Sequence, residues 1–285
     1  MQAPRVYHSE FQDSRRWQGF PFREGDILIA TPPKCGTTWT QMMCALLIFQ
    51  TPKPPQLLSK LSPWLDMLTR DRDDVVAELE RQRHRRFIKS HTPLDGLPMD
   101  ERVTYICVGR DPRDVAVSMD HHRNNMDRAT LDARRAAVAG TDDIAAHRAL
   151  NPGPQAATLE GRFWEWMQSD APPERTTSNL RGTLRHFECA LAARERPNVI
   201  VLHYADLKAD LEGEMRRLAT QLGIEVPETT WPSLVRAASF EAMRAQSDRL
   251  IPEGRDGVFK NSKAFFHSGQ GGHWRSFFDV AAEQR

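Results

Sequence analysis

The stretch Asp26-Ile-Leu-Ile-Ala-Thr31, followed by Pro32-Pro-Lys-Cys-Gly-Thr-Thr-Trp39, predicts the fold of the chain around it. Its first six residues are apolar apart from their ends, which is typical of a parallel strand buried on both faces. The two prolines must end that strand, and Gly36 permits a tight turn. Apolar residues then recur at helical spacing up to Phe49. The sequence here predicts a strand, a turn and a helix.

The turn between this strand and this helix has the chemistry of an anion-binding site. The backbone N–H groups of residues 35–38 would point into it beside the positive end of the helix dipole, and the hydroxyls of Thr37 and Thr38 add donors. Lys34 adds a positive charge. The lysine precedes the glycine, so the pattern differs from the Gly-Lys-Ser/Thr loop of nucleoside-triphosphate-binding proteins. An ordinary strand-to-helix turn is the other interpretation.

Composition limits the class of protein. At 285 residues the chain can form one large domain without disulfides or metals. A formal charge of +1 gives no overall attraction to nucleic acid or to membranes, so any anion binding must be local. The four cysteines show no paired spacing, and the N-terminus has no apolar run of signal-peptide or membrane-span length. We therefore expect a cytoplasmic protein with reduced thiols, no nucleic-acid partner and no integral membrane association.

A second predicted strand ends in side chains suited to chemistry. Residues 86–93, Arg-Phe-Ile-Lys-Ser-His-Thr-Pro, predict a short strand that leads into a proline-bounded loop. Ligands of parallel sheets bind at the carboxyl ends of strands, which is where Lys89 and His91 fall. An imidazole can be neutral, and ready to accept a proton, at neutral pH. A lone histidine is otherwise more often structural.

A third predicted strand, residues 103–109, is followed by Arg110-Asp-Pro-Arg-Asp-Val-Ala-Val-Ser118. Asp111 would cap a helix whose first turn contains Pro112. Arg110 would lie at the strand end. Ser118 shares a helix face with Asp111, so it can point back toward the strand ends.

These motifs resemble those of the sulfotransferases that use 3′-phosphoadenosine 5′-phosphosulfate (PAPS), and in particular the cytosolic, small-molecule family in a bacterial form. Residues 33–39 resemble the family's 5′-phosphosulfate loop, and residues 89–93 resemble its Lys-Thr-His-x-Pro segment, with serine in place of threonine. Residues 110–118 resemble its 3′-phosphate motif. The resemblance extends from about residue 20 to residue 275, with residues 124–178 unmatched.

The resemblance implies in-line transfer of a sulfuryl group from PAPS to a hydroxyl or amine of a small-molecule or lipid acceptor, with 3′-phosphoadenosine 5′-phosphate (PAP) as product and no metal. It implies that His91 is the general base, that Lys34 and Lys89 stabilise the transferring group and the leaving phosphate, and that Ser118 helps to position Lys34. It also implies a nucleotide site formed by Lys34, Cys35, Gly36, Thr37, Thr38, Trp39, Arg110, Ser118, Tyr204, Ser239, Phe240, Met243, His267, Ser268 and Gly269.

The last motif departs from the family pattern. Residues 265–275 resemble a second 3′-phosphate loop, but His267 and Ser268 stand where the family has arginine and lysine. Losing two positive charges near a phosphate would weaken PAPS binding, at roughly 1.5–3 kcal/mol for each charge-assisted hydrogen bond. A neighbour could compensate, and the candidates are Lys260, Lys263 and Arg275.

Other side chains that could carry chemistry have plainer interpretations. Cys35 replaces the family's usual serine and is expected to act through its backbone N–H, although a thiol at a helix start can have a depressed pKa. Adjacent side chains on a helix diverge, so His121 and His122 are predicted to be surface residues and not metal ligands. The basic run of residues 81–86 is predicted to be a solvated face at a helix C-terminus.

Apolar residues outside the motifs are candidates for the acceptor pocket. Phe20 and Phe22 could form part of its wall or could cover the edge of the sheet. Trp64 and Met67 could line it or could pack in the core. Residues 124–178 carry too little apolar material for a core of their own, so we expect them to pass over the active-site mouth within a single domain, residues 1–285.

Strands near residues 27, 87, 105 and 200 alternate with helices, which predicts an α/β three-layer sandwich with a central parallel sheet and a P-loop-like nucleotide-binding plan. A nucleotide kinase-like phosphotransferase on the same fold is an alternative, although the chain has no Gly-Lys-Ser/Thr loop and no obvious magnesium carboxylate. A non-catalytic nucleotide-binding protein is another. The identity of the acceptor is not specified, and a homodimer is allowed through a partial match at residues 275–284.

Overall fold

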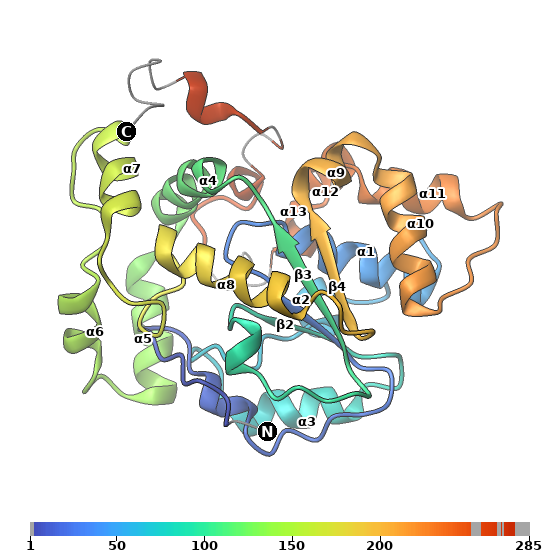
Figure 1. Ribbon diagram of the computed structural model, residues 1–285, viewed down its shortest axis with the longest axis horizontal. Helices are drawn as coiled ribbons and strands as arrows, with labels where there is room; N and C mark the ends of the chain where they lie inside the picture. Colours follow the sequence, from blue (N-terminus) through green and yellow to red (C-terminus); the bar gives the residue numbers. More distant parts are fainter. Residues whose placement is uncertain (1–2, 252–257, 267–268, 270, 277–285) are drawn as a thin grey trace.

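A parallel sheet of four strands forms the centre of the computed structural model, which describes residues 3–251, 258–266, 269 and 271–276 (Figure 1). The strand order is β2-β1-β3-β4. Ile27 pairs with Phe87 on one side and with Thr104 on the other. Because every pairing is parallel, the carboxyl ends of the strands meet at one edge. The predicted fold class is confirmed.

The bounds of the strands are β1 (Ile27–Ala30), β2 (Phe87–Ser90), β3 (Thr104–Gly109) and β4 (Val199–His203). The α-helices are α1 (Thr37–Phe49), α2 (Leu58–Leu61), α3 (Arg72–Arg81), α4 (Pro112–Asn125), α5 (Arg128–Ala139), α6 (Ile144–Leu150), α7 (Leu159–Gln168), α8 (Leu180–Ala193), α9 (Tyr204–Ala209), α10 (Leu211–Leu222), α11 (Trp231–Ala238), α12 (Phe240–Ala245) and α13 (Ser247–Leu250). Short 3-10 turns are η1 (Ser14–Trp17), η2 (Leu94–Gly96), η4 (Lys263–Phe265) and η5 (His273–Ser276).

Alternate residues of each strand face two different cores. Ile27 and Ile29 face a core shared with α1, α10 and α11. Leu28 and Ala30 face a second core shared with α3, α8 and the chain that precedes β1. Figure 1 shows α9 to α12 on one side of the sheet and α8 across it. Both faces are therefore covered, which explains why every residue of β1 is buried and apolar.

The basic run of residues 81–86 does not form one solvated face. α3 ends at Arg81, and the rest of the run lies in the connection to β2. Arg86 is 1% exposed and makes a bidentate ion pair with the buried carboxylate of Asp26. Removing one partner of such a pair typically costs about 3–5 kcal/mol, because the other charge stays buried. The expectation of solvent exposure is wrong for Arg86.

Phe20 and Phe22 belong to the second core and not to a pocket wall. Both are buried against Trp17, whose ring centroid lies 5.4 Å from that of Phe20 and 6.0 Å from that of Phe22. The Arg86 guanidinium lies 5.2 Å from the Phe20 ring centroid. The two phenylalanines thus cover the sheet, which was the alternative to the pocket interpretation.

The structure also bears on the expectations for the cysteines, for membrane spans and for the dimer motif. All four cysteines are buried free thiols. Over the described ranges, no helix combines the length and the apolar character that a membrane span requires. Most of the partial dimer motif at residues 275–284 lies outside the described residues, so the homodimer stays a prediction.

Candidate active site

A cavity of about 1350 Å³ opens at the edge where the strands end. Segments far apart in the sequence contribute to it. They range from the segment that precedes β1, residues 3–26, here called the lead-in, to the loop after η4. Of the residues predicted for the site, those that line the cavity are Lys34, Gly36, Thr37, Thr38, Trp39, Lys89, His91, Arg110, Ser118, Tyr204, Ser239, Phe240, Met243 and Gly269. His267 and Ser268 lie outside the described residues.

The turn before α1 presents uncapped backbone donors to this cavity. α1 begins at Thr37, and its N-cap, Gly36, has a φ of 102° and offers no side chain to the first-turn N–H groups. A Cβ atom on Gly36 would also lie 3.2 Å from the Tyr204 ring. Glycine is therefore required here both for the left-handed backbone and for the close packing. The uncapped helix start is suited to an anion.

Lys34 places an ammonium group beside these donors. Its backbone is also left-handed, with a φ of 68°, an unusual conformation for a residue with a side chain. Its Nζ atom lies 4.2 Å from the Phe265 ring centroid, and no carboxylate of the described residues pairs with it. Burial, together with the charges of Arg110 and Lys89, lowers the pKa of Lys34 to about 7. A bound anion would relieve this repulsion between cations.

Arg110 has a buried donor with no partner. Its Nη1 atom donates to the Lys34 carbonyl at 2.8 Å, and its guanidinium lies 4.2 Å from the Tyr204 ring centroid. Its Nε atom is buried and, within the described residues, makes no hydrogen bond. An unsatisfied buried charged donor is costly, and the planar guanidinium matches a phosphate group. The side chain is therefore held in place for a ligand with acceptor oxygens.

His91 is held in the tautomer that a general base needs. Its Nδ1 atom lies 2.7 Å from the Thr31 carbonyl, which can only accept, so Nδ1 carries the proton and Nε2 is left as the acceptor. Burial, and then the charge of Lys89, lowers the pKa of His91 well below its usual value. His186 Nε2 donates to the backbone carbonyl of His91 at 2.8 Å, which holds the backbone of His91 in place. The imidazole is thus neutral at neutral pH and fixed in orientation.

A buried carboxylate fixes the segment on both sides of His91. Asp66 accepts hydrogen bonds from the hydroxyls of Ser90 and Thr92, each at 2.6 Å. The Ser90 hydroxyl in turn accepts from the backbone N–H of Thr92 at 2.9 Å. Serine can therefore replace the family's threonine at this position, because only the hydroxyl is used. Asp66 was not predicted from the sequence, since no motif marks it.

Aromatic side chains form the wall next to the turn before α1. Trp39 donates from Nε1 to the Ala238 carbonyl at 2.9 Å and meets Tyr204 edge to face, with ring centroids 5.3 Å apart. Met243 is 3% exposed and packs behind them in the first core. This wall has the flat apolar surface that a nucleotide base requires.

Ser239 and Gly269 fix the next part of the wall. The Ser239 hydroxyl accepts from the backbone N–H of Ala242 at 3.2 Å and so caps α12. A Cβ atom on Gly269 would lie 2.5 Å from the Phe240 ring, and Gly269 has a φ of 63°. Gly269 therefore lets the loop after η4 pack directly on Phe240.

The segment predicted to be the second 3′-phosphate loop contacts α4. Asp114 accepts from the Gly272 N–H at 2.8 Å, and the Arg113 guanidinium lies 3.8 Å from the Trp274 ring centroid. These contacts explain the aspartate of the first phosphate motif. The three proposed substitutes for the missing charges do not line the cavity in the part of the chain that is described, so their compensation is not supported; they are Lys260, Lys263 and Arg275.

Cys35 lies behind the turn and not in the site. Its side chain is fully buried in a core with Val115 and Met119, and it does not line the cavity. Burial raises the pKa of its thiol to about 12. Its N–H donates to the Pro32 carbonyl at 3.3 Å. A depressed thiol pKa at the helix start is therefore not found, because the side chain points into the core. The expected role of the Cys35 backbone N–H stays a prediction.

His121 and His122 both line the cavity, which overturns their assignment to the surface. The His122 ring centroid lies 5.3 Å from that of Phe259 and 5.7 Å from that of Phe265. Burial, and then the charges of Lys34 and Lys89, lowers the pKa of His122 well below its usual value. The neighbouring loop covers this face of α4, and helical periodicity alone could not reveal that cover.

An apolar chamber forms the other end of the cavity. Its seven side chains make one cluster, and all of them line the cavity: Phe11, Trp64, Met67, Met126, Leu131, Val258 and Phe259. The Lys89 ammonium lies 3.9 Å from the Trp64 ring centroid, and the His91 ring meets the same indole edge to face at 4.7 Å. Trp64 therefore joins the chamber to the two polar side chains that end β2.

Polar residues form the rim of the chamber. They come from the lead-in, from α5 and α6, and from the chain on either side of α7. The segment 124–178 contributes many of them. The rim includes Ser9, Glu10, Arg128, Arg134, His147, Arg148, Asn151 and Arg175.

Comparison with known proteins gives a consistent result. Residues 24–285 match the sulfotransferase domain family. A glycolipid sulfotransferase of Mycobacterium bovis is 41% identical, over 98% of this chain and 88% of the relative. A glycolipid sulfotransferase of Mycobacterium tuberculosis is 40% identical over the same shares of the two chains.

Solved structures agree in fold. Retinol dehydratase, in a complex with retinol and PAP, has a TM-score of 0.68 and is 22% identical, covering 95% of this chain and 81% of the other. A mouse sulfotransferase complexed with PAP has a TM-score of 0.65 and is 20% identical, covering 94% and 83%. At these identities the likeness concerns the arrangement of the chain.

Proposed function

This chain belongs to the sulfotransferase domain family and is a sulfotransferase, and from that premise we propose that it transfers a sulfuryl group from PAPS to a hydroxyl of an amphiphilic acceptor. Membership of the family speaks against the kinase-like and the non-catalytic alternatives. The nucleotide, the roles of the residues and the acceptor class are the proposed part.

The polar end of the cavity fits PAPS. The uncapped start of α1 and the ammonium of Lys34 suit the 5′-phosphosulfate. The Nε of Arg110, which makes no hydrogen bond within the described residues, suits the 3′-phosphate, and Ser118 lines the same cavity. Trp39, Tyr204 and Phe240 offer flat surfaces to the adenine. The PAP complexes of proteins with this fold are consistent with that choice.

In the proposed mechanism, PAPS supplies the activated sulfuryl group, and the residues of this chain position it and move the proton. His91 Nε2 takes the proton from the acceptor hydroxyl as its oxygen bonds to sulfur. Lys34 stabilises the negative charge on the phosphate oxygen that leaves sulfur. Lys89 stabilises the oxygens of the sulfuryl group in transfer. Ser118 helps to position Lys34.

Two surfaces at the chamber end of the cavity support a proposal for the class of acceptor. The apolar chamber suits a hydrocarbon or ring system, and the polar rim suits sugar hydroxyls. The mycobacterial relatives are named glycolipid sulfotransferases. We therefore propose a glycolipid as the acceptor.

The observation that carries this proposal is the state of His91. Its Nδ1 proton is donated to the Thr31 carbonyl, so its Nε2 can accept a proton, and the residue lines the same cavity as Lys34 and Lys89. Hydrogen bonding alone thus prepares the imidazole to accept a proton from a bound hydroxyl.

Isothermal titration tests the nucleotide. We expect PAP to bind more tightly than adenosine 5′-phosphosulfate or ATP with magnesium. Arg110→Ala should weaken PAP binding on the order of 10- to 100-fold and leave adenosine 5′-phosphosulfate almost unchanged, since only PAP carries the 3′-phosphate. Arg102→Ala is the control, because this exposed arginine pairs with Asp100 and does not line the cavity. Preference for ATP with magnesium, or indifference to the 3′-phosphate, would overturn the proposal.

Transfer of radiolabelled sulfate from PAPS to a panel of glycolipids tests the acceptor. Product with a glycolipid, and little with simple phenols or with water-soluble sugars, is expected. Equal transfer to a water-soluble sugar would contradict the role given to the apolar chamber.

A further inference from the structure

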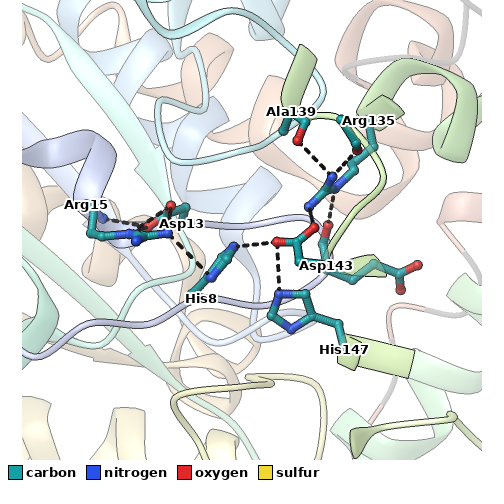
Figure 2. A network of polar contacts seen from close by, with 9 residues as sticks. His8, Asp13, Arg15, Arg135, Ala139, Asp143 and His147 are labelled. Atoms are coloured by element: carbon teal, nitrogen blue, oxygen red, sulfur yellow. Dashed lines mark hydrogen bonds and ion pairs between the residues drawn. The ribbon is translucent and has the colours of Figure 1, made fainter. Parts of the chain in front are cut away.

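Two histidines and an aspartate meet beside the cavity, which His147 lines (Figure 2). His8 Nε2 lies 3.2 Å from Asp143 Oδ2, and His147 Nε2 lies 3.4 Å from the same oxygen. The two imidazole rings meet edge to face, with centroids 4.6 Å apart. One nitrogen from each ring is therefore directed at a single carboxylate oxygen.

We propose that His8, Asp143 and His147 form a binding site for Zn²⁺. The three ligand atoms all lie within 4.8 Å of one another. Atoms bound at about 2.0–2.1 Å to a tetrahedral Zn²⁺ lie roughly 3.3 Å apart, which matches both measured nitrogen-to-oxygen distances. Imidazole nitrogen and carboxylate oxygen are ordinary zinc ligands, and a water molecule would complete the tetrahedron.

A buried arginine orients the carboxylate. Arg135 is 1% exposed, and its Nη2 donates to Asp143 Oδ1, leaving Oδ2 to face the histidines (Figure 2). The same guanidinium donates to the Glu10 carbonyl at 3.0 Å and to the Ala139 carbonyl at 3.2 Å. Outer partners of this kind fix metal ligands in most protein sites.

The other nitrogen of each imidazole can carry the proton that zinc binding requires. His147 Nδ1 is buried and has no hydrogen-bond partner in the described part of the chain. His8 Nδ1 lies 3.5 Å from Arg15 Nη2, whereas Arg15 Nη2 lies only 2.7 Å from Asp13 Oδ2. The hydrogen bond from Arg15 to His8 is thus long and weaker than the one to Asp13, and protonation of His8 Nδ1 would replace it. Each neutral ring can move its proton from Nε2 to Nδ1, so metal binding needs no net loss of protons.

The site would connect segments that the sheet does not hold. His8 belongs to the lead-in before β1, and Asp143 and His147 belong to α6 and the turn before it. Ser9, Glu10 and Arg148, next to these ligands, line the cavity. Bound zinc would therefore fasten the lead-in to the segment 124–178. This role is structural and does not depend on the proposed sulfuryl transfer.

Titration of the full chain with Zn²⁺ after chelator treatment tests the site. We expect one ion per chain, and a rise of the melting temperature by about 5 °C at a hundredfold excess of Zn²⁺ over its dissociation constant. His147→Gln and His8→Gln should each lower zinc affinity on the order of 100-fold. Substitution of Co²⁺ should give the visible absorption bands of a tetrahedral site, and these bands should be lost in both variants.

His203→Asn is the matched control. His203 is an exposed histidine that caps α9 by accepting from the Ala205 N–H, and asparagine can keep that hydrogen bond. Its zinc affinity should equal that of the wild type. Melting temperatures without zinc identify any variant that fails to fold, and His8→Gln, at a half-buried position, is the safer of the two. Absence of zinc binding, or equal binding in the wild type and both ligand variants, would overturn the proposal.

Discussion

The two ends of the cavity are built in different ways. The polar end, around Lys34 and Arg110, consists of short motifs that follow β1, β2 and β3 directly. The apolar chamber consists of single side chains from segments as far apart as Phe11 and Phe259. The edge of a parallel sheet collects the ends of its strands automatically, whereas the chamber depends on how long connections fold back.

Because of this difference, the polar end is more rigidly fixed by the fold than the apolar chamber is. Backbone donors and strand-end side chains at the polar end are fixed by the sheet, so they can hold a charged group in one orientation. The chamber can change its walls without changing the sheet. Proteins of this architecture can therefore keep one nucleotide site and differ in their acceptors.

The largest expected effect on turnover comes from substitution of His91, which lies between the two ends of the cavity. His91→Ala should lower kcat on the order of 10²- to 10⁴-fold while PAP affinity changes little, because in the proposed mechanism His91 moves the proton and does not hold the phosphates. Turnover with PAPS and a glycolipid, with PAP titration alongside, measures both. His203→Asn serves as the control. Unaltered turnover would remove His91 from the mechanism.

The polar end should respond to pH through Lys34. Its pKa is lowered to about 7 in the free protein, and a bound phosphate group should raise it. Above pH 7 the free protein has lost this proton and must take it up on binding. The dissociation constant for PAP should therefore rise by up to about tenfold per pH unit above pH 7, and this group should have no effect below pH 6.

Titration of PAP in buffers of different ionisation enthalpy measures this proton uptake. Lys34→Met is the matched variant, because it keeps an unbranched side chain and cannot titrate. It should bind PAP more weakly and lose this pH dependence. Persistence of the full pH dependence in Lys34→Met would assign the titration to another group.

A substitution in the apolar chamber should weaken binding of the acceptor and leave PAP binding unchanged. Met67→Ala should raise the KM for a glycolipid by about 3- to 30-fold, since up to roughly 2 kcal/mol of apolar contact is lost, and PAP binding should not change. Met215→Ala is the control, because Met215 is also buried, at 0% exposure against 7% for Met67, but packs in the first core. A matching rise of KM in both variants would mean that general destabilisation is being measured.

The smallest functional effect is expected at Phe20, which lies outside both ends. Phe20→Ala should lower stability by about 3–5 kcal/mol and the melting temperature by roughly 10 °C. The KM values for PAPS and for the acceptor should be unchanged below the unfolding transition. A changed KM for the acceptor would restore Phe20 to the pocket wall.

The sequence by itself determined the sheet and most of the polar end. The apolar run at residues 26–31, the turn with Gly36 and the helix that follows have local causes, and α1 spans the predicted residues. Lys89, His91 and Arg110 could be placed on the cavity because each lies at or just after the carboxyl end of a strand, and parallel strands end together.

Only the tertiary structure decided the direction of individual side chains and the walls of the chamber. Cys35 is a neighbour of Lys34 in the sequence, yet its thiol lies in a core and the lysine lies in the cavity. His122 is covered by a loop more than a hundred residues away, and Asp66 reaches Ser90 and Thr92 across the end of the sheet. Periodicity and motifs describe a residue's own segment. Packing between distant segments depends on the whole fold, and here it formed both the acceptor chamber and the histidine pair beside the cavity.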